Sequence, residues 1–323
     1  MKHLSILLPI GKTNLMKIVG TREIFEVANY VYSDNGKQPV FSIQFVGCDE
    51  KHEFVNGFVS IKSEVKFTNL SKTDLIIIPA IDDNYESVIA ENKELVEWLQ
   101  HQYKNGAAVA SLCTGAFLLA ATGLLAKKQC TTHWWAAPAL KKMFPEIKLV
   151  TERIITDEKG LYTSGGSISS FNLLLHLIEK YYDRATALSC ARALEIDIDR
   201  TIQSQFAIFS GQKDHTDEEV KQLQEFIEEN ISEKLSIESL ANKFGLSKRN
   251  LERRFKKATG NTPVEYIQRV KVEAAKRTLE SSRKTVNDVM YGVGYADVKA
   301  FRTIFKKYTG ISPIEYKLKY SKE

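Results

Sequence analysis

The sequence lacks an apolar run of the ~18–20 residues that a helix needs to cross a bilayer. Its first nine residues are basic and then only briefly apolar, and no small-residue cleavage site follows them. A secretory signal peptide has a longer apolar segment and such a site. We therefore expect a cytoplasmic protein without a membrane partner, in which these residues form a buried first strand.

Cysteine is also scarce, with four residues in a chain of 323. Cys48, Cys113, Cys130 and Cys190 form no CxxC pair and no metal-like spacing with the six histidines. A disulfide framework belongs to small secreted domains, and this chain is long enough to bury a sizeable core. We expect reduced thiols, no metal site and no cofactor.

The formal net charge of +5 is unevenly distributed along the chain. Residues 234–323 hold 21 Lys and Arg against 9 Asp and Glu, whereas residues 1–233 hold 24 against 31. A basic C-terminal part on an acidic body is typical of a module that binds DNA electrostatically. The alternative is a solvated basic face with no partner.

The basic part contains an internal repeat. Residues 255–266 recur as residues 305–316 at an offset of 50, and eight of the twelve positions are identical. Each copy predicts a helix, a tight turn and a second helix. In the first copy Ser236 and Ser247 are suitable N-caps, and Gly245 ends the helix between them.

The second copy follows the same plan, with Thr285 as a cap and Gly294 as the helix end. Between the copies, residues 264–279 form one long amphipathic helix that would hold the two units at a fixed separation. A helix-turn-helix lays its second helix in the major groove, so two such units could reach successive grooves ~34 Å apart. A helical bundle with solvated arginines is the alternative.

The stretch from about residue 218 to 319 resembles the C-terminal domain of the AraC/XylS family of bacterial transcription regulators. The most telling part is residues 289–316, with Gly294-Tyr295, Phe301, Phe305-Lys306-Lys307 and Gly310-Ile-Ser-Pro313. The resemblance places the base-reading positions at Arg249, Glu252, Arg253, Lys299, Arg302 and Thr303. Phosphate contacts suit the lysine pairs at the helix ends, which are Lys256, Lys257, Lys306 and Lys307.

The N-terminal two thirds alternate apolar strand-like runs with helical patterns. Strands are expected at residues 5–8, 40–46, 75–79 and 107–111, and a hairpin turn at 157–160. Helices are expected at residues 21–32, 92–103, 114–121, 137–144, 170–181, 184–194 and 202–209. Strands that are apolar throughout indicate a parallel sheet covered on both faces, hence an α/β layered sandwich.

Cys113 lies at the predicted turn from a strand to a helix, in the sequence Ser-Leu-Cys113-Thr-Gly-Ala-Phe. A helix N-terminus lowers the pKa of a thiol, and His133 could contact it as a base. The segment 113–125, followed by Thr132-His133-Trp134, resembles the DJ-1/PfpI superfamily, and more closely the GlxA-like version fused to AraC-type domains. The resemblance spans about residues 4–190 and implies a flavodoxin-like three-layer sandwich.

One position departs from that resemblance. Enzymes of the superfamily place a carboxylate near the start of the first helix, and the position falls near Lys17 here, with Glu23 as the closest acid. We therefore expect no catalysis and interpret Cys113 as part of a ligand pocket. The candidates for that pocket are Lys17, Glu23, Cys113, Thr114, His133 and Gly165. The alternative is a cysteine-dependent hydrolase, amidase or glyoxalase, with Cys113 and His133 as its catalytic residues.

Together these patterns predict a sandwich domain for sensing and dimerisation at residues 1–205 and a linker at 206–216. An all-α domain with two helix-turn-helix units follows at 217–323. The expected partners are double-stranded DNA, a small-molecule effector, a second copy of the chain and RNA polymerase. The effector, the operator and the sign of regulation are left open.

Overall fold

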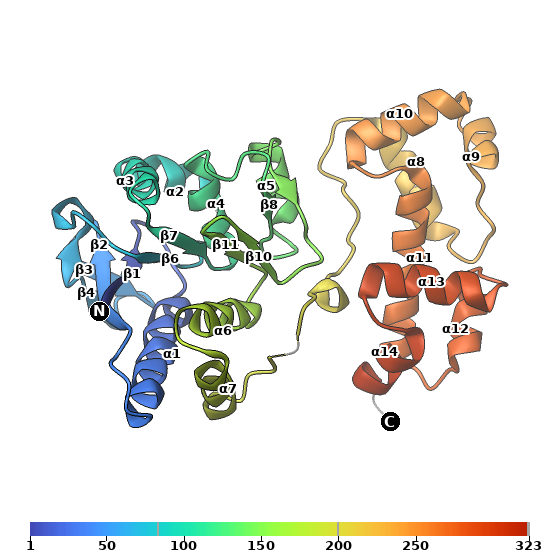
Figure 1. The fold of residues 1–323 in the computed structure, drawn as a ribbon. Helices are drawn as coiled ribbons and strands as arrows, with labels where there is room; N and C mark the ends of the chain where they lie inside the picture. The colour runs from blue at the N-terminus through green and yellow to red at the C-terminus, as the bar shows by residue number, and fades with distance from the viewer. Residues whose placement is uncertain (83, 199, 322–323) are drawn as a thin grey trace. The chain divides into compact units, whose positions relative to one another are not determined.

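The computed structural model describes residues 1–82, 84–198 and 200–321. It divides into two compact units, Met1–Gln203 and Ser204–Glu323 (Figure 1). Among the described residues no helix is both long enough and apolar enough to span a membrane.

The first unit is built on a seven-stranded sheet with the order β10-β11-β7-β6-β1-β2-β5. All neighbouring pairs are parallel except the β10–β11 hairpin at one edge. The strands of this sheet are β1 (Lys2–Leu8), β2 (Phe41–Gly47), β5 (Val65–Lys66), β6 (Leu75–Ile78), β7 (Ala108–Ser111), β10 (Ile155–Glu158) and β11 (Leu161–Ser164). Two small pairs lie outside it, β3 (Lys51–Phe54) with β4 (Val59–Lys62) and β8 (Gln129–Cys130) with β9 (Lys148–Leu149).

Helices cover both faces of the sheet (Figure 1). One hydrophobic core lies under α1 (Leu15–Asp34), α6 (Ser169–Tyr181) and α7 (Arg184–Ala193). A second core lies under α2 (Tyr85–Glu91), α3 (Lys93–Lys104), α4 (Ala116–Ala121) and α5 (Ala137–Met143). All four residues of β6 and of β7 are buried, as the apolar runs predicted. The predicted flavodoxin-like three-layer sandwich is confirmed.

The second unit is all-helical. Its helices are α8 (Glu218–Glu229), α9 (Ile237–Lys243), α10 (Lys248–Thr259), α11 (Pro263–Ser281), α12 (Val286–Gly292), α13 (Val298–Thr309) and α14 (Pro313–Tyr320). It has two separate hydrophobic cores. The long helix α11 joins them, because Tyr266 and Ile267 belong to the first core whereas Val272, Ala275 and Leu279 belong to the second.

The helix predicted at residues 202–209 is wrong. Only Ser204–Phe206 form a short 3-10 turn, and Ile202 makes an antiparallel bridge with Arg153. The physical reason is the side chain of Gln203, which is buried and bonded to several backbone groups of the first unit. Its Nε2 donates to the carbonyl oxygens of Thr132 (2.8 Å) and Thr151 (2.9 Å), and its Oε1 accepts from the Gly166 amide (3.1 Å).

The charge division also takes a different form once the units are known. The first unit holds 22 Lys and Arg against 23 Asp and Glu, so it is nearly neutral. The acidic excess comes from residues 204–233, which hold eight Asp and Glu against two Lys. These residues belong to the second unit and include α8. Acidic and basic surfaces therefore occur within the same helical unit.

Candidate nucleic-acid interface and effector site

Helix α10 separates an apolar face from a charged one. Ser247 caps it by accepting a hydrogen bond from the Asn250 amide, and Gly260 ends it in the left-handed conformation. Leu251 and Phe255 point inward and are 1% and 0% exposed. The candidate DNA-contacting residues all lie exposed on the rest of the helix; they are Arg249, Glu252, Arg253, Lys256 and Lys257.

Helix α13 repeats this arrangement 50 residues later. Asp297 is its N-cap, and Gly310 ends it in the left-handed conformation. Phe301 and Phe305 take the inward positions and are 1% and 0% exposed. The second set of candidates is again exposed and consists of Lys299, Arg302, Thr303, Lys306 and Lys307. The structure therefore exposes both sets to solvent, each on the second helix of its helix-turn-helix pair.

The turns before these helices require glycine. Gly245 and Gly294 have φ angles of 64° and 72°, which L side chains rarely adopt. At Gly294 a side chain would also collide with the backbone carbonyl of Ser232. Each glycine lets the chain reverse within a few residues, so that the second helix of the unit leaves at a steep angle.

The duplication extends to a buried tyrosine in each core. Tyr266 donates a hydrogen bond from its hydroxyl to Glu228 on α8 (2.7 Å), and Tyr316 donates to Glu280 on α11. Burial and the facing carboxylate both raise the pKa of each tyrosine. Helix α8 therefore supports the helix-turn-helix pair of α9 and α10, as α11 supports the pair of α12 and α13.

The sequence analysis missed the role of Arg254. Its Nε and Nη2 donate to the two carboxylate oxygens of Asp217 (3.0 and 2.6 Å), and its Nη1 pairs with Glu219. The paired guanidinium lowers the pKa of Asp217. A bidentate pair of this kind fixes orientation as well as distance. Arg254 thus fastens α10 to the acidic helix α8. The basic residues of α10 that remain for an external partner are Arg249, Arg253, Lys256 and Lys257.

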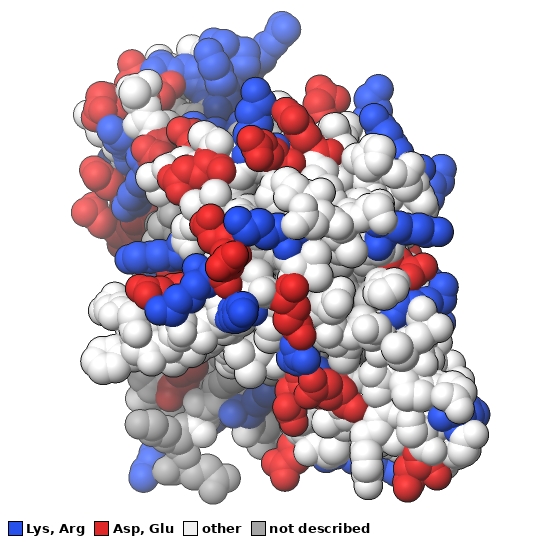
Figure 2. All heavy atoms as spheres, turned by 90° about the vertical axis from the view of Figure 1, so that its left-hand side faces the viewer, with Lys and Arg blue, Asp and Glu red and all other residues white. Residues whose placement is uncertain are grey.

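Not every face of the molecule is as rich in basic residues as the exposed sides of α10 and α13. On the face shown in Figure 2, Lys and Arg side chains lie intermixed with Asp and Glu side chains. Surface pairs such as Arg22 with Glu26 and Glu64 belong to this kind of pattern in the first unit. Mixed charge of this kind offers no continuous attraction to a polyanion.

In the first unit Cys113 lies at a strained turn between β7 and α4. It has a φ of 56°, and its amide donates to the Ser164 hydroxyl (3.1 Å). Two residues later, a Cβ on Gly115 would lie 2.5 Å from the carbonyl oxygen of Pro79. Only glycine lets α4 start this close to the end of β6. The predicted strand-to-helix turn at the cysteine is confirmed.

Lys17 approaches this turn from α1. Its side chain is 2% exposed, and its ammonium donates to the carbonyl oxygen of Ser167. Burial lowers the pKa of Lys17 to about 8, and the neighbouring Cys113 thiol partly offsets that effect. An ammonium therefore occupies the place where the resemblance implies a carboxylate.

His133 is a poor candidate for a general base. Burial lowers its pKa to about 4, and the positive charge of Lys17 adds to that effect. Its Nδ1 accepts from the Trp135 amide (3.3 Å), and within the described residues it makes no hydrogen bond to Cys113. A base with so low a pKa cannot readily take the proton of a thiol. This geometry does not form a cysteine–histidine catalytic pair.

The other pocket candidates divide into two groups. Thr114 is buried at the turn and donates to the Ile81 carbonyl oxygen (2.6 Å), and Gly165 lies tightly against the amide of Gln203. Glu23 is exposed and does not join them. The structure therefore brings Lys17, Cys113 and His133 together beside Thr114 and leaves Glu23 outside.

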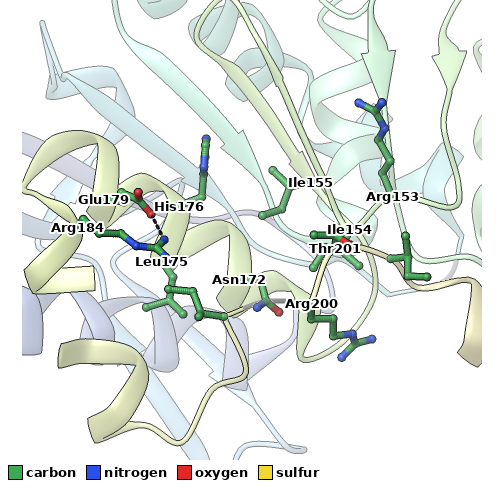
Figure 3. A pocket seen from close by; sticks show the side chains of 12 residues that line it. Arg153, Ile154, Ile155, Asn172, Leu175, His176, Glu179, Arg184, Arg200 and Thr201 are labelled. Carbon is green, nitrogen blue, oxygen red and sulfur yellow. Dashed lines mark hydrogen bonds and ion pairs between the residues drawn. The ribbon is translucent and has the colours of Figure 1, made fainter. Parts of the chain in front are cut away.

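A separate cavity of about 490 Å³ lies elsewhere in the first unit (Figure 3). None of the six pocket candidates lines it. Its walls come from α6, α7, the start of β10 and the chain just before the unit boundary; the lining residues are Arg153, Ile154, Ile155, Asn172, Leu175, His176, Glu179, Arg184, Ile198, Arg200, Thr201 and Ile202. No local motif marks this site, because it depends on segments far apart in the sequence.

Comparison with known proteins finds similarity in both units. The profile of the DJ-1/PfpI family matches residues 29–180, and a helix-turn-helix domain profile matches residues 240–319. The HTH-type transcriptional regulator CdhR of Pseudomonas aeruginosa is 24% identical over 301 residues, which cover 93% of this chain and 87% of the relative. The regulator GbdR of the same species is 25% identical over 222 residues, covering 68% of this chain and 60% of the relative.

The chain thus spans about three fifths of the length of GbdR. Among solved structures, a protein from Vibrio parahaemolyticus whose description proposes a transcriptional regulator has a TM-score of 0.54 and 25% identity. That match covers 60% of this chain and 98% of the other protein. The relatives that match most of this chain are named as regulators rather than as enzymes.

Proposed function

Because the chain joins a DJ-1/PfpI domain to an AraC-type helix-turn-helix domain, we propose that it is a sequence-specific DNA-binding regulator of transcription. The observation that carries the proposal is the duplicated pair α10 and α13. Each helix buries two large apolar side chains and exposes a basic face in the same register. Two such helices on one rigid connector are suited to two successive major grooves.

The two sets of exposed residues divide by chemistry. We assign base reading to two sets of residues. They are Arg249, Glu252 and Arg253 on α10, and Lys299, Arg302 and Thr303 on α13. Arginine is the usual bidentate partner of guanine. The paired lysines at the ends of both helices provide phosphate contacts, which give affinity without sequence information.

In this proposal the first unit senses a small molecule and does not catalyse a reaction. The site around Cys113 contains the buried cation Lys17, so a group bound there would be anionic. The proposal also includes a homodimer formed through the first unit, which rests on the family resemblance and on the frequency of symmetric dimers among soluble oligomers. A contact with RNA polymerase is included on the family resemblance alone.

The test starts with selection of bound sequences from a random duplex pool by the full chain. On the selected site we expect Arg302→Ala to cost ~1–3 kcal/mol and to relax specificity at one position. Lys306→Ala should weaken binding to all duplexes by a similar factor and reduce the salt slope by about one.

Lys104→Ala, at the exposed last residue of α3, is the control for general loss of positive charge. Its affinity for both selected and random duplexes should stay within about twofold of the unmodified chain. Equal weakening of selected and random DNA by Arg302→Ala would remove the base-reading assignment. If the pool yields no enriched sequence at any ionic strength, the regulator proposal itself fails.

A further inference from the structure

The cavity in Figure 3 combines apolar walls with arginine side chains. Ile154, Ile155, Leu175, Ile198 and Ile202 supply the apolar part. The charged side chains that line it are three arginines and one glutamate. A volume of about 490 Å³ is within the range of small-molecule sites.

Two of these guanidinium groups, those of Arg153 and Arg184, differ in their partners. Arg184 is already paired with Glu179 (2.6 Å), as the dashed line in Figure 3 shows. Arg153 instead donates to the neutral amide oxygen of Gln129 at 3.3 Å, and it is exposed. A weak neutral partner is readily exchanged for an anion, since a charge-assisted bond is stronger. Of these two, Arg153 therefore has the partner that an anionic group would replace more easily.

One wall of the cavity leads directly to the end of the first unit. The Ile154 amide donates to the Thr201 carbonyl oxygen (3.2 Å), and Arg153 bridges Ile202. The next residue is Gln203, whose side chain bonds to the loops that carry His133 and Gly166. A molecule that pushes on residues 200–202 therefore acts on the residue that precedes the helical unit.

We propose that this cavity binds a small organic anion with an apolar body, held by Arg153. Occupancy shifts residues 200–203 and so changes how the chain binds DNA. The second statement rests on the proposed regulatory function, whereas the binding itself does not. The site is distinct from the turn at Cys113, because none of the cavity residues belongs to it.

The binding test uses 4-phenylbutanoate and its primary amide, which share a carbon skeleton and differ in charge. Calorimetric titration of the full chain should detect the carboxylate and show roughly tenfold weaker binding of the amide. Arg153→Gln should weaken carboxylate binding by a similar factor. Arg192→Gln on α7 removes the same charge outside this cavity and should change it by less than about twofold.

Ile155→Trp tests the location without changing charge, because the larger ring fills the space beside β10 and should abolish binding. Equal binding of acid and amide, or full binding by Arg153→Gln or Ile155→Trp, would overturn the site. So would the absence of any binding of the carboxylate.

The link to DNA is measured separately, as the affinity for the selected duplex with and without the carboxylate. A change in affinity that disappears in Arg153→Gln supports the link. Binding of the carboxylate without any effect on DNA affinity contradicts the link and leaves the site in place. Failure of DNA binding altogether contradicts the proposed function and leaves the calorimetric result unaffected.

Discussion

Replacing Lys17 by methionine should stabilise the first unit at neutral pH. The side chain is 2% exposed, and burial lowers the pKa of its ammonium from 10.5 to about 8. Each pKa unit corresponds to about 1.36 kcal/mol, so the buried charge destabilises the folded state by roughly 3 kcal/mol. The substitution also removes a hydrogen bond to Ser167, worth about 1 kcal/mol. The expected net gain at pH 7 is therefore roughly 2 kcal/mol.

The gain should depend on pH in a defined direction. Between about pH 8 and 10.5 the unfolded chain binds the Lys17 proton and the folded chain does not. Stability of the unmodified chain therefore rises with pH across that window. The advantage of Lys17→Met should be constant below pH 8 and should shrink steadily toward pH 10.

The assay is urea unfolding followed by tryptophan fluorescence at several pH values. It reports on the first unit alone, because Trp98, Trp134 and Trp135 all belong to it. Lys12→Met, at an exposed position before α1, is the control and should show neither gain nor pH dependence. A Lys17→Met chain that is less stable at pH 7, or whose difference from the unmodified chain does not vary with pH, would refute the reasoning.

Three further predictions test other parts of the structure. Arg254→Ala should lower the thermal midpoint of the second unit by roughly 4 °C or more and weaken DNA binding, because α10 loses its bidentate contact with Asp217. The control is Lys248→Ala, which breaks only an exposed ion pair and should cause neither effect. Gly115→Ala should destabilise the first unit by ~1–3 kcal/mol through its backbone collision, whereas Gly292→Ala, with open space around it, should stabilise the second by up to ~1 kcal/mol in chemical denaturation. In NMR titration, the ring of His133 should remain neutral from pH 8 to pH 5, because burial lowers its pKa to about 4; a midpoint near 6.5 would contradict this.

Local patterns were enough to predict most elements of the fold. The apolar runs of β6 and β7 and the capping serine, glycine and threonine residues of the helical unit act within a few residues of where they stand. The predicted start of α1 lies six residues too late, because the charged Lys17 interrupts the apolar pattern at its N-terminus. The hairpin of β3 and β4 is not among the predicted elements, since its strands have four residues each and Phe54 is the one buried residue in them.

The site was harder to predict wherever it depends on distant contacts. The motif around Cys113 placed the turn correctly, and the approach of Lys17 to the thiol agrees with an expectation drawn from resemblance. Gln203 was assigned to a helix because its neighbours are partly apolar. Its actual role depends on carbonyl groups 52 and 71 residues earlier in the chain. The cavity beside Arg153 likewise requires a knowledge of packing that no local pattern contains.

In the proposed complex with DNA, the acidic residues of the helical unit restrict which face of α10 lies against the duplex. Helix α8 supports the pair of α9 and α10 and carries acidic residues at both ends. Arg254 connects α10 to that acidic helix through Asp217 and Glu219. Elsewhere on α10, Arg249, Lys256 and Lys257 are exposed. Repulsion of DNA on the acidic side and attraction to these residues favour a single orientation. Helix α11, which supports the pair of α12 and α13, contains Arg269, Lys271 and Lys276 as well as acidic residues. Binding by α10 should therefore depend more strongly on electrostatic orientation. Binding by α13 should depend more on its direct contacts with bases.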